Sequence, residues 1–308
     1  MKPHRASSRI CPICKSKASI LFKKLLPHCS FNNQEKLLRC LACGLISISP
    51  FPSKKQIMSI YSSNDYIKNY EKCNIKWAGG KKKVADYLKR KLTEAETLVG
   101  NKGKLLDIGA GSGAFLAHAK ISGWQVKGVE ISSDWVKYAK KNSGLKLFYG
   151  ELKQANFTTN SFDLIHLNHV LEHVYQPIEL LIEIKRLLKP NGYLMIEVPQ
   201  EIYPLSEFIQ FYLSHKIRFK FLTKKILLKK RLMPKLPQSL HLFFFTVKSL
   251  KKLMQNSGFQ IKTLKTIRRN QQTDKTIYAS ERVARLVYAL EKKLYLGPNI
   301  TLTALKPT

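Results

Sequence analysis

The sequence predicts an α/β protein with a doubly wound, mostly parallel sheet and a small cysteine-rich module before it. Strand-like and helix-like segments alternate between about residues 100 and 200. A glycine-rich loop joins the first of these strands to a helix, and two cysteine pairs stand within the first 50 residues. Strands that alternate with helices favour a parallel sheet covered by helices on both faces.

The glycine-rich loop lies in the stretch KLLDIGAGSGAFL at residues 104–116. Its apolar start predicts a buried strand, and its glycines permit positive φ and a close approach of the backbone to a ligand. The helix expected from about Ala114 presents unpaired N–H groups, which suit a carboxylate or phosphate. The glycines alone also fit a dinucleotide-binding loop. Asp107, two residues before the first glycine, suits an ammonium group or bound water better than a pyrophosphate.

The spacing Asp107-x-Gly109-x-Gly111-x-Gly113 resembles the first motif of class I S-adenosylmethionine (SAM)-dependent methyltransferases. The order FDLI, VLEHV and LLKPNGYLMIEVP within residues 162–199 is similar to small-molecule members of that family. This resemblance covers nearly all the chain except residues 201–240. It implies a Rossmann-like sheet, SAM as the cofactor and a cofactor site at the carboxyl ends of the strands.

Acidic and polar residues follow the later strands at the same edge. Glu130 ends the second strand, where it can accept both ribose hydroxyls, and Ile131 follows it. The resemblance implies that an acid after the third strand contacts the adenine amino group; Glu151 stands there instead of the more usual Asp, before Leu152. Asn168 is at the tip of the fourth strand. The expected SAM-binding set is Asp107, Gly109, Gly111, Gly113, Glu130, Ile131, Glu151, Leu152 and Asn168.

Histidines supply the catalytic candidates. The resemblance implies that a histidine before the aromatic run at 243–245 borders the substrate pocket, so His241 is the candidate general base or substrate contact. His169 and His173 also permit a catalytic interpretation, although local hydrogen bonding is favoured for His173. Methyl transfer from a sulfonium needs mainly alignment in a dry site, so a catalytic dyad is not required.

The N-terminal module, residues 1–50, holds CPIC at 11–14 and CLACG at 40–44. Two such pairs predict a closed, tetrahedral S4 site for a structural Zn²⁺ ion. Buried free cysteines are the alternative, but they do not explain the paired spacing. The knuckle, the strand and the following Ser-Pro-Phe-Pro resemble bacterial methyltransferases that carry an N-terminal zinc ribbon. The expected zinc ligands are Cys11, Cys14, Cys40 and Cys43.

The remaining chain divides by composition. We expect a helical linker and N-terminal cap over 51–100 and the SAM-binding methyltransferase domain over 101–308. Residues 201–240 form a helical, basic and aromatic insertion after the fifth strand, interpreted as a substrate lid. No acidic residue stands between Glu207 and Asp274, whereas sixteen lysines and arginines do.

The chain has 308 residues and a formal net charge of +34. Such a charge attracts polyanions such as nucleic acid, anionic lipid or phosphorylated glycans. A source that simply favours lysine explains it equally well. The apolar runs are too short to span a bilayer, and no secretory signal is visible. We therefore expect a cytoplasmic protein, with peripheral contact to an anionic membrane as an alternative.

The leading functional prediction is a SAM-dependent methyltransferase whose acceptor is a small molecule, a lipid-linked intermediate or a glycan. Oxygen, nitrogen and carbon all stay open as the accepting atom. One alternative is an RNA or DNA methyltransferase that uses the zinc ribbon and basic surface; NHVL at 168–171 disfavours it, because the amino-methylating signature N/D-P-P-Y/F is missing. Another is a catalytically inactive binding module. The oligomeric state is not predicted.

Overall fold

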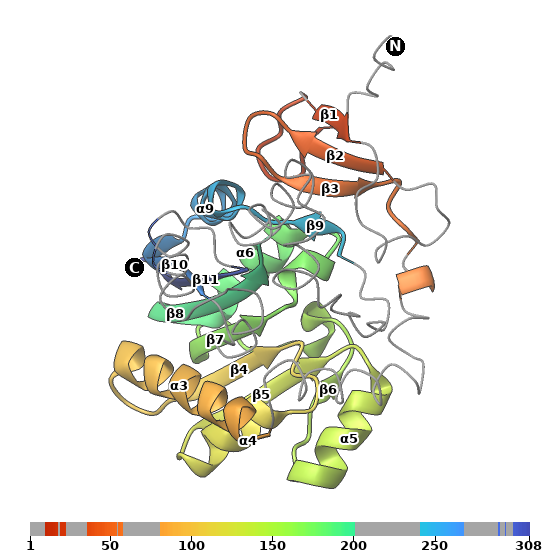
Figure 1. The fold of residues 1–308 in the computed structure, drawn as a ribbon. Helices are drawn as coiled ribbons and strands as arrows, with labels where there is room; N and C mark the ends of the chain where they lie inside the picture. Colours follow the sequence, from red (N-terminus) through yellow and green to blue (C-terminus); the bar gives the residue numbers. More distant parts are fainter. Residues whose placement is uncertain are drawn as a thin grey trace, which may run out of the picture.

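The computed structural model describes residues 10–17, 19–22, 36–53, 55–57, 81–200, 241–267, 289, 293 and 298–308. The basic insertion expected over 201–240 lies outside these residues. The described chain forms a large sheet flanked by helices and a smaller sheet at its N-terminal end (Figure 1). The predicted α/β fold class is confirmed.

The large sheet has seven strands in the order β10-β11-β8-β7-β4-β5-β6. Strands β4 to β8 are parallel to their neighbours in this group, and β11 is antiparallel to both β8 and β10. The strands are β4 (Lys104–Ile108), β5 (Gln125–Glu130), β6 (Phe148–Tyr149), β7 (Phe162–Asn168), β8 (Leu188–Pro199), β10 (Gln260–Ile267) and β11 (Asn299–Leu305).

Helices cover both faces of this sheet (Figure 1). Because successive strand side chains point to opposite faces, Leu105 joins one hydrophobic cluster and Leu106 the other. One cluster includes α3 (Lys81–Val99), α4 (Ala114–Ile121) and α5 (Ser133–Ser143), and the other includes α6 (Pro177–Leu187) and α9 (Val247–Asn256). Two 3₁₀ turns, η1 (Leu152–Ala155) and η2 (Leu171–His173), follow β6 and β7. The core therefore lies in two layers, one on each side of the sheet.

Strand β8 includes residues 189–192, whose sequence KPNG is typical of a turn. Asn191 does have a left-handed backbone, with φ of 58°. Pairing continues on both sides of it, since Leu188 pairs with Phe162 and Tyr193 with Leu164 across a register shift. The chain therefore bends at Asn191 without leaving the sheet.

The small sheet joins two ends of the chain. It comprises β1 (Ser19–Phe22), β2 (Lys36–Cys40), β3 (Ile46–Ser49) and the distant β9 (Phe243–Phe244), in that order. Strand β9 pairs antiparallel with β3, and the Ile48 amide donates to the Leu242 carbonyl over 3.1 Å. Phe243 and Phe244 are almost completely buried. The N-terminal module is therefore fastened to the segment between the large sheet and α9.

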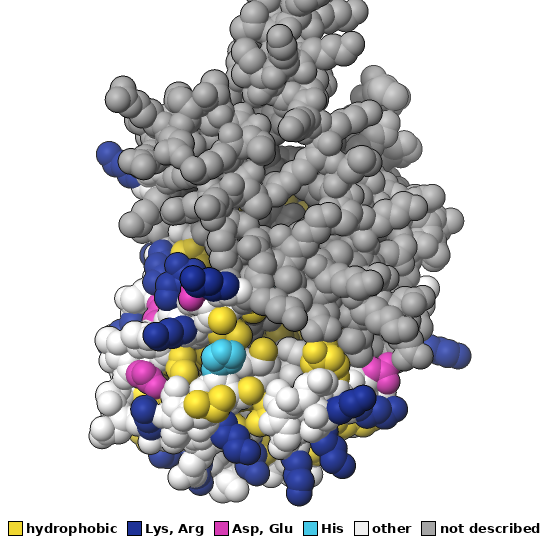
Figure 2. All heavy atoms as spheres, turned by 60° about the horizontal axis from the view of Figure 1, so that its bottom comes forward, with side chains coloured by type: hydrophobic (Ala, Val, Ile, Leu, Met, Phe, Trp, Pro, Cys, Tyr) yellow, Lys and Arg dark blue, Asp and Glu magenta, His cyan; other side chains and the backbone are white. Residues whose placement is uncertain are grey.

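Lysine dominates the described surface. Figure 2 shows lysine and arginine side chains dispersed over the lower face of the molecule, with few acidic ones. Within residues 101–150 every exposed charged side chain is a lysine, namely Lys102, Lys104, Lys120, Lys127, Lys137, Lys140, Lys141 and Lys146. Among the described residues, no helix combines the length and the apolar character that crossing a membrane requires.

Candidate cofactor and acceptor site

The candidate site lies where the strand order reverses. The chain enters the sheet in the middle at β4, moves outward through β5 to β6, and returns on the other side of β4 as β7. Neighbouring parallel strands connected in opposite directions leave a crevice outside their carboxyl ends, where ligands bind in open α/β sheets. The β4 end carries Asp107 and the glycine loop, and the β7 end carries Asn168.

The glycine loop combines tight packing with open space. Gly109, Gly111 and Gly113 have φ of 69°, 53° and 73°. A Cβ atom on Gly109 would lie 2.4 Å from Val170 Cγ2, and one on Gly113 would lie 2.8 Å from Leu145 Cδ1. A Cβ atom on Gly111 would meet no atom of the described residues within 4 Å. Gly109 and Gly113 therefore allow the loop to pack closely, whereas Gly111 faces space that is free of described atoms and could take a ligand.

Glu130 holds this loop in place. Its Oε2 accepts a hydrogen bond from the Gly111 amide at 2.7 Å, and its Oε1 accepts one from the Ser132 amide at 2.9 Å. Burial raises the pKa of Glu130 above its usual range, although those two amides act in the opposite direction. A carboxylate offers about four acceptor positions, so Glu130 keeps capacity for hydroxyl donors while it braces the loop.

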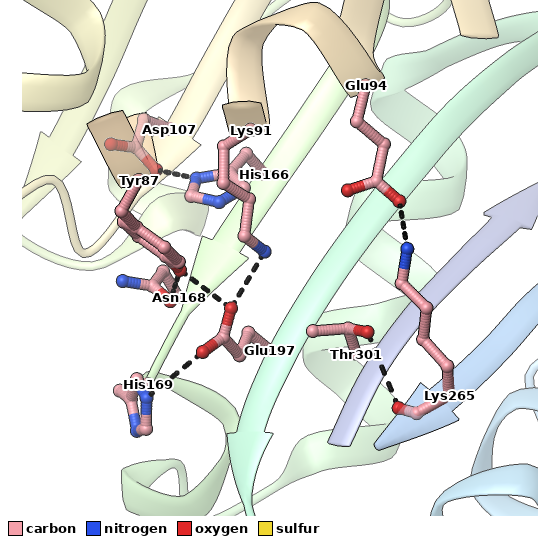
Figure 3. A network of polar contacts seen from close by, with 10 residues as sticks. All are labelled: Tyr87, Lys91, Glu94, Asp107, His166, Asn168, His169, Glu197, Lys265 and Thr301. Atoms are coloured by element: carbon pink, nitrogen blue, oxygen red, sulfur yellow. Dashed lines mark hydrogen bonds and ion pairs between the residues drawn. The ribbon is translucent and has the colours of Figure 1, made fainter. Parts of the chain in front are cut away.

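Asp107 is oriented by a histidine that sequence reasoning missed. His166 Nδ1, on the neighbouring strand β7, donates to Asp107 Oδ1 over 2.8 Å, and both side chains are buried (Figure 3). The His166 ring also lies 4.3 Å from the Phe115 ring, centroid to centroid. Its Nε2 atom is buried with no hydrogen-bond partner among the described residues. His166 therefore fixes one oxygen of Asp107 from within the core.

Asn168 belongs to a second polar group that the sequence did not reveal (Figure 3). The Tyr87 hydroxyl, from helix α3, lies 2.7 Å from Glu197 Oε2 and 3.3 Å from Asn168 Oδ1. Lys91 Nζ, one turn further along α3, lies 2.9 Å from the same Glu197 oxygen. Glu197 is fully buried. The available signal was Glu197 itself, because it is a single acid within the apolar strand β8.

The remaining predicted cofactor residues lie beside Glu130. Ile131 follows it directly and is half-buried. The Gly150 amide donates to the Glu130 carbonyl over 3.0 Å, which places the turn after β6 at the end of β5. In that turn Glu151 is exposed and caps η1, whereas the Leu152 side chain is buried in the core. The structure thus brings these residues to one edge of the sheet.

The predicted catalytic histidine lies in a separate cluster just after β7. Glu172 is fully buried on η2, with Oε1 3.1 Å from His169 Nδ1 and 3.8 Å from His173 Nε2. The His241 ring centroid lies 4.9 Å from that of His173. The Leu242 amide donates to the Glu172 carbonyl over 2.8 Å, which brings His241 to η2. His169 also reaches toward Glu197, at 3.8 Å (Figure 3).

The histidines keep Glu172 ionised. Burial alone would raise its pKa, but the hydrogen bond from His169 and the nearby His173 and His241 lower the pKa to about 2. A buried carboxylate thus faces three imidazoles at the carboxyl edge of the sheet. This group can hold or move a proton, or hold a cation.

The four predicted cysteine ligands converge at the tips of the small sheet. Sγ atoms of Cys11 and Cys43 lie 3.6 Å apart, those of Cys14 and Cys40 lie 3.4 Å apart, and all four lie within 4.8 Å of one another. Zinc–sulfur bonds of about 2.3 Å in a tetrahedron place sulfur atoms roughly 3.8 Å apart. The four thiols are thus compatible with one bound metal ion.

The two cysteine knuckles share one backbone pattern. In the first, the Lys15 amide donates to the Cys11 carbonyl; in the second, the Gly44 amide donates to the Cys40 carbonyl. Lys15 has φ of 60° and Gly44 has φ of 76°. Lys15 therefore adopts the left-handed conformation that glycine takes in the second knuckle. The Asn256 side chain, at the end of α9, donates to the Ile13 carbonyl over 2.8 Å and ties the first knuckle to the large domain.

Comparison with known proteins places this architecture. The seven-stranded sheet with its glycine loop and following acid is that of class I SAM-dependent methyltransferases. Residues 81–264, more than half of the chain, match the model of a family described as a methyltransferase domain. The chain belongs to this family, so the resemblance seen in the sequence is confirmed at the level of family and fold.

Relatives and solved structures agree with that placement. Over 119 residues the chain is 32% identical to a ubiquinone biosynthesis O-methyltransferase of Actinobacillus pleuropneumoniae serotype 7 (strain AP76), covering 35% of this chain and 49% of the relative. The chain thus spans about half the length of the curated relatives it matches. A Burkholderia thailandensis 1,6-didemethyltoxoflavin-N1-methyltransferase with bound S-adenosylhomocysteine has a TM-score of 0.52, 16% identity and coverage of 91% and 98% of the two chains. The [4+2]-cyclase SpnF has a TM-score of 0.51, 20% identity and coverage of 84% and 98%.

Proposed function

We propose that the protein is a SAM-dependent methyltransferase whose acceptor is a small molecule, a lipid-linked intermediate or a glycan. The observation that carries this proposal is the braced glycine loop at the reversal of strand order. There Gly111 borders open space while its amide is held by Glu130. The proposed SAM-binding residues are Asp107, Gly109, Gly111, Gly113, Glu130, Ile131, Glu151, Leu152 and Asn168.

The residues of this edge fit the parts of SAM by their chemistry. SAM, when bound, supplies an electrophilic methyl group on a positively charged sulfur. Glu130 accepts hydrogen bonds from the ribose hydroxyls with the acceptor positions that the loop leaves unused. Asp107, held by His166, places negative charge toward the ammonium group. Asn168, fixed through Tyr87 and its contact with Glu197, marks the place where acceptor and methyl group meet.

The acceptor proton is handled by the histidine–carboxylate cluster. In the sequence, Val170 stands between Asn168 and Glu172, and its Cγ2 atom lies 2.4 Å from the position that a Cβ atom on Gly109 would take. The cluster therefore adjoins the cofactor loop. His241, the base predicted from the sequence, belongs to the cluster with Glu172 and His173. A hydroxyl acceptor fits this chemistry, because its proton must leave as the new bond forms. The named O-methyltransferase activity of curated relatives supports the same accepting atom.

The four cysteines fit a structural Zn²⁺ ion. Four thiolates would close its coordination sphere, so the ion would support folding and take no part in chemistry. Cys11, Cys14, Cys40 and Cys43 are the ligands in this proposal.

Methylation of nucleic acid is the second candidate, and the exposed lysines of residues 101–150 favour it. RNA binding that persists at physiological salt and depends on RNA sequence would support this candidate. Binding that does not depend on RNA sequence, or that is lost between low and physiological salt, would indicate only a general attraction of lysines to phosphate and would leave the small-molecule acceptor. A non-methylating enzyme is a further outcome, since the fold also occurs in a [4+2]-cyclase.

Isothermal titration with S-adenosylhomocysteine tests the proposed site. We expect saturable binding by the wild type and at least tenfold weaker binding by Asp107→Ala and Glu130→Ala. Asp134→Ala, which removes a carboxylate on helix α5 that lies 3.7 Å from Lys137, is the matched control and should bind as the wild type does. Unchanged affinity in both site variants would refute the assigned pocket. If the wild type binds S-adenosylhomocysteine as expected, incubation of the protein with cell extract and labelled SAM would identify the methylated acceptor.

A further inference from the structure

Glu172 is a buried carboxylate with one unused oxygen. Oε1 is engaged by His169, whereas Oε2 is buried and has no hydrogen-bond partner among the residues that the structure describes. The side chain has no exposed surface. Leaving an acceptor of an ionised group unsatisfied in the protein interior is costly, so such an atom indicates a missing donor or cation.

Two imidazoles from separate segments converge on this carboxylate. His173 follows Glu172 on η2, and His241 is brought in by the backbone hydrogen bond between Leu242 and Glu172. The nearest ligand atoms of Glu172, His173 and His241 all lie within 4.8 Å of one another. One carboxylate and two imidazoles form the ligand set of many catalytic zinc sites, which keep a coordination position open for water or substrate.

We propose that Glu172, His173 and His241 bind a divalent transition-metal ion of the zinc class, at a site separate from the four cysteines. His169 is a positioning residue for this site, because its Nδ1–H donates to Glu172 Oε1 and leaves Oε2 as the metal ligand. The cysteine site has four sulfur ligands and is closed, whereas this site has three nitrogen and oxygen ligands and is open.

The metal site also narrows the acceptor class, and this step rests on the proposed function. An acceptor hydroxyl that takes the open position would lose its proton more readily, because a bound divalent ion lowers the pKa of coordinated oxygen. With the metal bound, the proton passes to solvent and not to His241, because the lone pair of that imidazole is then used for coordination. The acceptor oxygen then forms the bond to the methyl carbon as the carbon–sulfur bond breaks, and sulfur keeps the electron pair as a neutral thioether. The proposal therefore predicts O-methylation.

Metal analysis after equilibrium dialysis against micromolar Zn²⁺ provides the test. We expect two ions per chain in the wild type and one in Glu172→Gln, His173→Ala and His241→Ala. His118→Ala is the matched control, because that histidine bonds to the Ala114 carbonyl within its own helix, α4, and it should keep two ions. With Co²⁺ instead of Zn²⁺, the cluster variants should lose weak visible bands and retain the intense sulfur charge-transfer bands of the cysteine site.

One ion per wild-type chain, unchanged in the three cluster variants, would overturn the metal proposal. When the cysteine site already holds one ion, further Zn²⁺ should raise the melting temperature of the wild type but not that of Glu172→Gln. This measurement detects the second site without relying on the other variants. Titration with S-adenosylhomocysteine separates this outcome from failure of the proposed function. The cluster variants should bind that ligand within a few-fold of the wild type, whether or not they hold the second metal.

Discussion

In the proposed site Glu130 both braces the glycine loop and binds the cofactor, and these two roles have opposite demands on its charge. Its carboxylate is buried against the Gly111 and Ser132 amides, and burial raises its pKa. An acid whose pKa is raised on folding contributes most stability while it is protonated, below about pH 4. That contribution is lost as pH increases through the raised pKa. A charged Glu130, as the proposed cofactor site requires, would therefore carry a cost in stability.

Glu130→Gln should separate these tasks. Glutamine keeps an oxygen acceptor for the Gly111 amide but avoids the buried charge, so the variant should gain stability relative to the wild type as pH rises from 4 to 7. Its affinity for S-adenosylhomocysteine should fall at least tenfold, about 1.4 kcal/mol. Urea unfolding at both pH values and calorimetry measure the two effects. Loss of stability together with unchanged affinity would show that Glu130 is only structural.

For the buried ion pair of Lys91 and Glu197, the effect on stability depends on whether one partner or both are removed. Both side chains are nearly or fully inaccessible to solvent, and the Tyr87 hydroxyl completes the group. Removal of one partner from such a pair leaves an uncompensated buried charge, whereas removal of both does not.

Lys91→Met should therefore destabilise the protein by about 3–5 kcal/mol, and Lys91→Met/Glu197→Gln should recover much of this loss. Lys102→Met, which removes an exposed lysine 4.0 Å from Glu96, is the control and should cost less than about 1 kcal/mol. Chemical denaturation of the four proteins gives these values. A single variant as stable as the control would show that Glu197 is not charged in the folded protein.

At the level of elements, the cysteine knuckles illustrate how backbone geometry constrains sequence. Both need a left-handed residue directly after their second cysteine, and Lys15 supplies it in one case while Gly44 supplies it in the other. The left-handed conformation costs a residue with a Cβ atom roughly 1–2 kcal/mol. Substitution by glycine removes this strain, but glycine loses more conformational entropy on folding, so the net gain in stability is smaller.

Lys15→Gly should thus stabilise the zinc-loaded protein by up to about 1 kcal/mol, and Gly44→Ala should destabilise it. The second substitution adds conformational strain and little crowding, because its Cβ would lie 3.6 Å from Thr246 Oγ1. Thermal unfolding of the two variants and the wild type provides the comparison. Equal melting temperatures for all three would mean that the knuckles do not limit stability.

Much of the candidate site was predictable because local rules control it. The positive φ at residue 111 favours glycine, and the two C-x-x-C pairs identify the cysteine ligands. The alternation of predicted strands and helices places Asp107 and Glu130 at or near the ends of strands. Predictions for these residues as SAM ligands still await a binding measurement. His166, Tyr87 and Lys91 were not predictable, because their partners depend on strand order and on where α3 packs.

On the scale of the whole molecule, the N-terminal module shares its sheet with a later part of the chain. Strand β9 extends its sheet, and the buried Phe243 and Phe244 continue into the segment that leads to α9. A strand of two residues carries almost no sequence signal of its own, so this connection appeared only in the structure. Because the small sheet is shared, folding of the N-terminal module should be coupled to folding of the large domain.

Removal of the metal ion proposed to bind the four cysteines should therefore lower the melting temperature of the entire chain by several degrees. About 2–4 °C is expected per kcal/mol for a protein of this size. Differential scanning calorimetry before and after treatment with a strong chelator, with metal restored as the control, measures this change. A large-domain transition that stays unchanged after metal removal would show that the two parts unfold independently.

We propose that the point where the strand order reverses holds an adenosyl sulfonium cofactor. Calorimetric titration of the wild-type chain with S-adenosylhomocysteine and, separately, with NAD⁺ tests this assignment. We expect one saturable site for S-adenosylhomocysteine and no binding of NAD⁺. Binding of NAD⁺ with no binding of S-adenosylhomocysteine would contradict it.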